Sequence, residues 1–147
     1  MAKFKFSLKS VEKYRNVLLD EAKGRYAKAV ADSERQVERI DNLKNELNIQ
    51  NEELNLKNSQ GISILELQGY KTYMKILENN IKDEEYKLKM LRKIEQKRRF
   101  EMIAAKTDAM SIEKLKEKRW EEYLKEEEKR QQESTLEFVS NQISRRD

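Results

Sequence analysis

Residues at alternating steps of four and three form one mostly apolar stripe along the second half of the chain, from Tyr70 to Tyr123. This pattern is a heptad seam without a phase slip. A helix of that length spans roughly 80 Å at about 1.5 Å per residue, so the stripe predicts a rod. Because one helix cannot bury such an edge alone, we expect a second helix to lie against it. The seam positions are Tyr70, Met74, Leu77, Ile81, Glu84, Leu88, Leu91, Glu95, Arg98, Met102, Ala105, Ala109, Ile112, Lys116, Arg119 and Tyr123.

A second stripe lies in the first half of the chain. It begins with an alternation, Phe4-Lys5-Phe6-Ser7-Leu8, which we interpret as the frayed start of the first helix. The steps from Ala22 to Tyr26 and from Tyr26 to Val30 are both four residues, which predicts a stutter that loosens left-handed supercoiling. The stripe consists of Leu19, Ala22, Tyr26, Val30, Ser33, Val37, Ile40, Lys44, Leu47 and Leu54.

The periodicity fails between Asn55 and Ser63, where small and turn-prone residues gather. Gly61 stands where a left-handed backbone is needed, and Ser63 followed by Glu66 is typical of a capping box at the start of a helix. We therefore predict a single all-α domain over residues 1–147, in which two long helices form an antiparallel coiled-coil hairpin. The first helix covers about 6–56, the turn about 57–63 and the second helix about 64–140.

A turn near residue 60 pairs positions whose numbers add up to about 120, so Ile40 faces Ile81 and Val11 faces Ala109. The second helix outruns the first, and the part after Lys116 is expected to have no partner within the chain. That overhang still carries apolar side chains, namely Trp120, Tyr123, Leu124, Leu136, Phe138, Val139 and Ile143.

Composition favours this thin fold over a globule. The 147 residues are 41% charged and 37% hydrophobic, with no proline and a mean hydropathy of -1.04. There is enough apolar material for a seam two helices wide, but too little for a thick core. Disorder is the competing interpretation for so polar a chain, and the sustained periodicity argues against it.

The residue types exclude several kinds of chemistry. Without cysteine or histidine the chain has no disulfide, thiolate nucleophile, ordinary zinc site or histidine acid-base pair. The three glycines fit no phosphate-binding loop, and a two-helix rod has no cavity that excludes water. We predict no enzyme, no cofactor and no metal. No run is apolar enough for a signal peptide or a membrane span, so we expect a cytoplasmic protein without membrane insertion.

Charge is distributed unevenly. Residues 1–30 hold eight Lys or Arg against three Asp or Glu, and residues 85–106 hold the same numbers. The pairing rule places both stretches on the same part of the hairpin, its base, whereas the tip near the turn is slightly acidic. The base is either a solvated face with i,i+4 pairs or a site for an acidic protein surface, nucleic acid or anionic lipid. The chain lacks any groove-reading motif, so nucleic acid is disfavoured.

Aromatic residues mark the tip. Tyr70 and Leu77 lie on the seam, where packing within the hairpin is an equally good explanation for them. Tyr73 is one step off the seam, so its ring should be partly exposed. Exposed aromatic side chains are favoured anchors for protein partners.

Three stretches, which together cover nearly the whole chain, form one recognisable order. They are Phe4-Lys5-Phe6-Ser7-Leu8, then Gly61-Ile62-Ser63 leading to Tyr70-x-x-Tyr73-x-x-x-Leu77-x-x-x-Ile81, and Glu113-Lys114-Leu115-Lys116-Glu117-Lys118 with Glu121-Glu122-Tyr123. In this order and spacing they resemble the FliJ family of bacterial flagellar export proteins. The late Glu133-Ser134-Thr135-Leu136-Glu137-Phe138 departs from the acidic patch that often ends the family's second helix.

The resemblance implies a coiled-coil hairpin similar to the central stalk of rotary ATPases, which inserts into the export ATPase hexamer and stimulates it. It also implies contact with the cytoplasmic domain of the membrane export gate and with export chaperones, at the inner face of the membrane at the flagellar base. The gate contact would be Tyr70, Tyr73, Leu77 and Ile81. The ATPase-ring contact would be Lys13, Arg15, Arg25, Arg98, Arg99, Trp120 and Tyr123.

Two alternatives remain open from the sequence. One is a self-associating coiled coil that serves as a scaffold or spacer. The other is the corresponding stalk protein of a virulence-type secretion system or of another ATPase, which has the same physical pattern.

Overall fold

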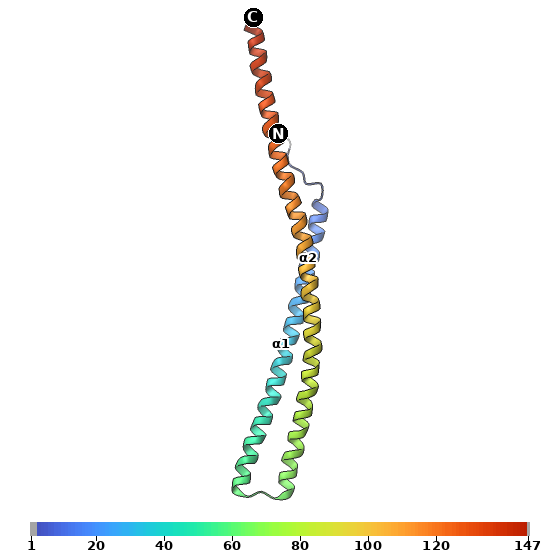
Figure 1. The fold of residues 1–147 in the computed structure, drawn as a ribbon, viewed down its shortest axis with the longest axis vertical. Helices are drawn as coiled ribbons and strands as arrows, with labels where there is room; N and C mark the ends of the chain where they lie inside the picture. Colours follow the sequence, from blue (N-terminus) through green and yellow to red (C-terminus); the bar gives the residue numbers. More distant parts are fainter. Residues whose placement is uncertain (1–2, 147) are drawn as a thin grey trace. The chain divides into compact units, whose positions relative to one another are not determined.

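The computed structural model describes residues 3–146, which form two long helices and no strand (Figure 1). Helix α1 covers Lys9–Gln60 and helix α2 covers Ile64–Arg146. The predicted fold class, an all-α antiparallel hairpin, is confirmed. Helix α2 begins where predicted, whereas α1 begins a few residues later than predicted. Both helices end a few residues later than predicted, because no proline or glycine cluster stops α1 before the turn or α2 after residue 140.

The turn between α1 and α2 follows the predicted chemistry. Gly61 has a φ of 93°, a conformation that is unfavourable for a residue with a Cβ. The Oγ of Ser63 accepts a hydrogen bond from the backbone N–H of Glu66 at 3.2 Å, so Ser63 caps α2. The left-handed Gly61 is confirmed, and so is the half of the predicted capping box in which Ser63 caps α2.

The chain divides into two compact units, each of which pairs a segment of α1 with an antiparallel segment of α2. Unit 1 contains the described residues up to 20 and from 103 on, and unit 2 contains residues 21–102. In unit 2, Gln36 contacts Glu84 and Glu46 contacts Tyr73. The numbers of each pair add up to about 120, as expected when α1 and α2 fold back at the turn that Figure 1 shows.

The predicted seam of α2 is confirmed by burial. Its nine positions from Tyr70 to Arg98, together with Met102, are all buried or half-buried in unit 2. In unit 1 the seam continues through half-buried Ala105, Ala109, Ile112 and Lys116. Arg119 is the exception, because its side chain is exposed and turns toward Ser7.

The seam of α1 differs from the prediction at Ala29. Ala29 is buried and Val30 only half-buried, so the steps from Ala22 through Tyr26 are four and then three. The predicted stutter is therefore wrong. A small alanine side chain fits at the contact itself, and the larger Val30 lies beside it. Lys44 is likewise exposed while Leu43 is half-buried, because a lysine leaves its charged end in water.

The chain before α1 is an arm, not the start of a helix. Residues 3–8 have no helical conformation, and α1 begins at Lys9. Residues 7–8 form a turn, and the backbone N–H of Lys9 donates a hydrogen bond to the Phe6 oxygen at 3.2 Å. A non-helical chain is not held to the rise of about 1.5 Å per residue of a helix, so the arm can reach farther along α2 than a helix of the same length. This reach overturns the prediction that α2 has no partner after Lys116, since the arm contacts Trp120 and Tyr123.

Candidate binding surfaces

Three aromatic rings cluster in unit 1 where the arm meets α2. The ring of Phe4 lies 5.1 Å from that of Trp120, edge to face, and 5.4 Å from that of Tyr123. Trp120 and Tyr123 stack at 5.6 Å. Phe6 of the same arm is buried, and Arg119 donates a hydrogen bond to Ser7 at 3.1 Å. The arm therefore holds Trp120 in place while 44% of its surface remains exposed.

A groove of about 750 Å³ opens beside this cluster, between the start of α1 and the facing part of α2. Phe4 and Trp120 line one end, and Leu19, Ala109 and Met110 contribute further apolar surface. Exposed apolar surface next to a fixed indole is typical of a protein-binding site.

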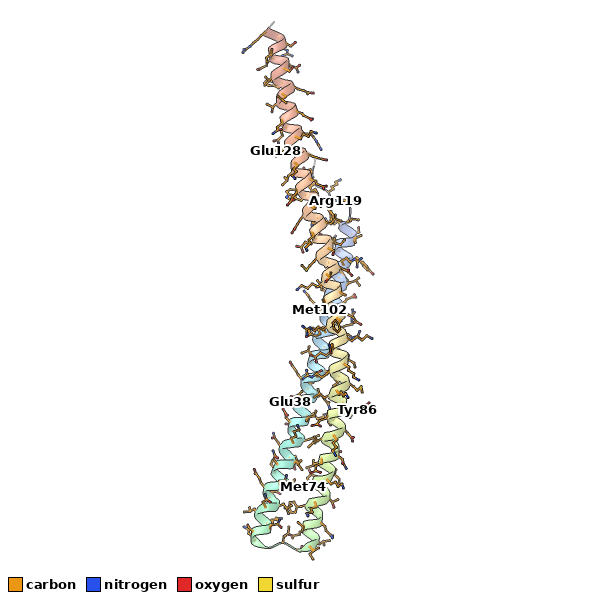
Figure 2. The ribbon with its side chains drawn as sticks, viewed as in Figure 1. Glu38, Met74, Tyr86, Met102, Arg119 and Glu128 are labelled. Atoms are coloured by element: carbon orange, nitrogen blue, oxygen red, sulfur yellow. The ribbon has the colours of Figure 1, made fainter. Side chains whose placement is uncertain are left out.

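Two ion pairs hold the helices together around the groove. Lys116 contacts Glu12 at 3.2 Å, and Arg15 contacts Asp108 at 2.8 Å (Figure 2 labels nearby Arg119). Two of the predicted ATPase contacts in unit 1 therefore differ. Arg15 forms an ion pair with Asp108, whereas Lys13 is exposed. Trp120 and Tyr123 lie together, as described above.

Sequence reasoning missed Phe4 as part of this cluster. Its only signal was the alternation of Phe4 and Phe6, a pattern typical of extended chain, which we interpreted as a frayed helix. The rule that facing positions add up to about 120 holds for two paired helices, so it did not indicate which part of α2 a non-helical arm would reach.

The remaining predicted ATPase contacts belong to unit 2. Arg98 donates to Glu101 at 2.9 Å, and this hydrogen bond is the main reason that the pKa of Glu101 is lowered. The charges of Lys97 and Arg25 lower it further. Arg25 and Arg99 are exposed, and Arg99 lines a shallow groove with Tyr26 and Arg92.

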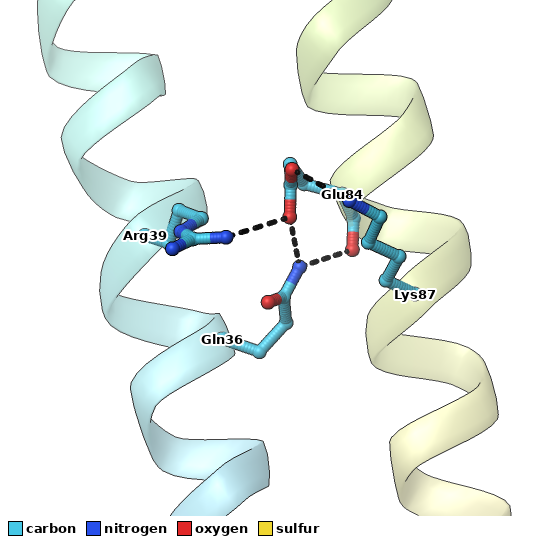
Figure 3. A network of polar contacts seen from close by, with 4 residues as sticks. All are labelled: Gln36, Arg39, Glu84 and Lys87. Carbon is cyan, nitrogen blue, oxygen red and sulfur yellow. Dashed lines mark hydrogen bonds and ion pairs between the residues drawn. The ribbon is translucent and has the colours of Figure 1, made fainter.

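A polar layer interrupts the apolar seam of unit 2 (Figure 3). Gln36 is buried and donates hydrogen bonds from its Nε2 to the backbone oxygen of Glu84, at 2.9 Å, and to the Glu84 carboxylate. Lys87 lies 3.3 Å and Arg39 3.9 Å from the same carboxylate. The hydrogen bond from Gln36 lowers the pKa of Glu84, with Lys87 and Arg39 acting in the same direction and burial opposing them. Polar layers of this kind specify how two helices align.

At the tip, the four predicted gate contacts have different surroundings. Tyr73 is 41% exposed and donates a hydrogen bond to Glu46 at 3.4 Å. Tyr70 is half-buried, with the Lys57 ammonium 5.1 Å from its ring centre. A hydrogen bond to Tyr70 is the main cause that raises the pKa of Lys57. Leu77 and Ile81 are buried in the seam, so they hold the hairpin together beneath the surface that Tyr73 presents.

The described helices contain no segment that is both long and apolar enough to cross a membrane. The two paired helices have polar contacts across their seam and expose aromatic and basic side chains. This combination is typical of coiled-coil proteins that act by binding other proteins. The chain belongs to the FliJ family, since the family model described as flagellar FliJ protein matches residues 4–147. Members of this family are non-catalytic components of the flagellar export apparatus. Comparisons with curated proteins and with solved structures gave no match.

Proposed function

We propose that this chain is the stalk component of the flagellar export apparatus, which binds the export ATPase hexamer and stimulates it without catalytic groups of its own. In this proposal both units belong to one hairpin over residues 1–147. The chain works in the cytoplasm, at the inner face of the membrane at the flagellar base. It also links the ATPase to the cytoplasmic domain of the export gate and to export chaperones.

The observation that carries the ATPase contact is the exposed Trp120 beside the groove of unit 1. A tryptophan held by Phe4 and Tyr123 loses little conformational entropy when it is buried by a partner. Lys13, Arg25 and Arg99 are exposed and supply the positive charge that an acidic ring lumen would attract. Arg15 and Arg98 contribute less in this proposal, since each is already paired with a carboxylate.

The gate contact is proposed for Tyr73 and the adjacent Tyr70. Between them lies a shallow groove that Gln50 and Gly69 also line. Leu77 and Ile81 support this surface from the seam.

Binding assays with two reciprocal variants test the two contacts. Trp120→Ala should weaken binding to the purified ATPase hexamer by at least about tenfold, the loss expected for an aromatic anchor, and leave gate binding intact. Tyr73→Ala should do the reverse, so that each variant is the control for the other. Equal losses of both activities in either variant, with helicity unchanged, would contradict the assignment of separate contacts.

A further inference from the structure

The side of α2 that faces away from α1 in unit 2 carries positive charge that forms no ion pair within the described residues. We define the outer face as those positions of α2 between residues 75 and 100 that lie on the opposite side of the helix from the seam. Five exposed lysines lie on it, against the single acidic residue Asp83. The lysines are Lys75, Lys82, Lys89, Lys93 and Lys97.

None of these five ammonium groups has a carboxylate of a described residue within 4.0 Å. Elsewhere on α2, Arg92 is paired with Glu95 and Arg98 with Glu101, each three residues away. Glu85, which borders the outer face, is paired with Lys44 of α1 at 3.4 Å. Lys97 acts through space on the pKa of Glu101, but no ion pair within the described residues uses the ammonium group of any of the five lysines. Most of the positive charge of the outer face is therefore available to a partner outside the hairpin.

Two large rings share this face. Tyr86 is 62% exposed and Phe100 is 64% exposed, although neither contributes to the seam (Figure 2 labels Tyr86). They are two heptads apart on the same line of the helix, with Lys93 midway between them. Exposed aromatic rings among lysines are complementary to a surface whose outer layer is anionic and whose interior is apolar.

We propose that the outer face of α2 binds the surface of an anionic lipid bilayer. Five lysines over roughly 33 Å of helix contact a flat negative surface together, while Tyr86 and Phe100 enter the headgroup region. A third helix fits less well, because the line from Tyr86 through Met90 to Phe100 is broken by Lys93 and Lys97 and offers no continuous apolar edge. The helix lies on the bilayer and does not cross it.

This inference goes beyond the proposed function, because the ATPase and gate contacts use none of these seven side chains. Failure of lipid binding leaves the protein contacts untouched, and their failure leaves the lipid contact untouched.

Vesicle flotation of the full chain tests the proposal. Vesicles of phosphatidylcholine with about 30 mol% phosphatidylglycerol should bind the chain, and phosphatidylcholine alone should not. Replacing the five lysines by glutamine should weaken binding to the anionic vesicles by at least about a hundredfold. The matched control replaces five exposed lysines elsewhere, Lys23, Lys28, Lys114, Lys118 and Lys125, removes the same net charge and should weaken binding by less than about threefold.

A second pair of variants tests the rings. Tyr86→Ser with Phe100→Ser should weaken vesicle binding by about tenfold, whereas Tyr14→Ser with Phe138→Ser, also exposed, should not. Circular dichroism confirms that all variants remain helical, and loss of wild-type binding at about 0.5 M salt checks the electrostatic part without any substitution.

Three outcomes would overturn the proposal. The first is equal binding to neutral and anionic vesicles. The second is equal loss in the two five-lysine variants, which would make net charge the cause. The third is binding of polyglutamate or RNA that depends on the outer-face lysines, with no binding to vesicles, which would assign the face to an acidic polypeptide or a nucleic acid instead.

Discussion

The ring of Phe4 packs edge to face on Trp120, with 5.1 Å between their centres, and this contact fixes the arm on α2. The two residues are far apart in the sequence, and the non-helical segment 3–8, which ends in a turn at residues 7–8, brings them together. The arm has two consequences for unit 1. It covers apolar surface that α1 does not reach, and it orients the indole that we propose to bind the ATPase.

Phe4→Ala should release the arm and leave Trp120 mobile, since an aromatic pair of this geometry contributes about 1 kcal/mol beyond its buried area. Trp120 is the chain's single tryptophan, so its fluorescence reports the site directly. We expect a red-shifted emission and stronger quenching by acrylamide. Phe138→Ala, which removes an exposed ring, is the control and should change neither. Unchanged quenching in Phe4→Ala would mean that the arm does not hold the indole.

Leu77→Ala should lower the free energy of unfolding by about 2 to 4 kcal/mol, because it removes a buried seam side chain that is 4% exposed. The neighbouring Ile76 is 51% exposed, and Ile76→Ala should change the free energy by less than about 0.5 kcal/mol. Urea denaturation followed by circular dichroism measures both. Similar losses in the two variants would show that Leu77 is not the seam residue.

Gly61→Ala should destabilise the chain by about 1 to 2 kcal/mol. No atom beyond Gly61 and its two chain neighbours lies within 4 Å of the added methyl group, so the cost comes from the positive φ. Gly69→Ala is the matched control, since Gly69 lies within α2 and also has open space around it. There alanine should stabilise by up to about 1 kcal/mol. Opposite signs in urea unfolding are expected, and a stabilised Gly61→Ala would contradict the left-handed turn.

The polar layer predicts a dependence of stability on pH. Because the native pKa of Glu84 is lowered, its ionised form stabilises the fold above its unfolded pKa, near 4.5, and this contribution disappears as pH falls through the native value. Glu84→Gln should therefore be less stable than the wild type at pH near 7, with the difference shrinking in acid. Glu38→Gln, on an exposed face of α1, is the control and should show no such convergence. If the difference in stability between the wild type and Glu84→Gln did not change with pH, the charge of Glu84 would not be the source of the stabilisation.

Much of the fold follows from the sequence because heptad spacing and turn chemistry act locally. The seam from Tyr70 to Lys116, the positive φ of Gly61 and the cap at Ser63 could all be predicted in this way. The choice of Ala29 over Val30 depends on how closely the helices approach, which no single stripe encodes.

The candidate surfaces were less predictable than the fold. The docking of Phe4 depends on the path of a non-helical arm, and the pairing of Arg15 with Asp108 depends on the rotation of both helices. The exposure of Tyr73 was predictable, because one step off a seam places a side chain at its edge.

The central claim is that this chain acts by binding the export ATPase. The most direct test adds increasing amounts of the chain to the purified ATPase at low salt and measures ATP hydrolysis per hexamer. Our proposal predicts that turnover rises and saturates, and that Trp120→Ala shifts the rise to higher concentration. Constant turnover through and beyond stoichiometric amounts of the wild-type chain would contradict it.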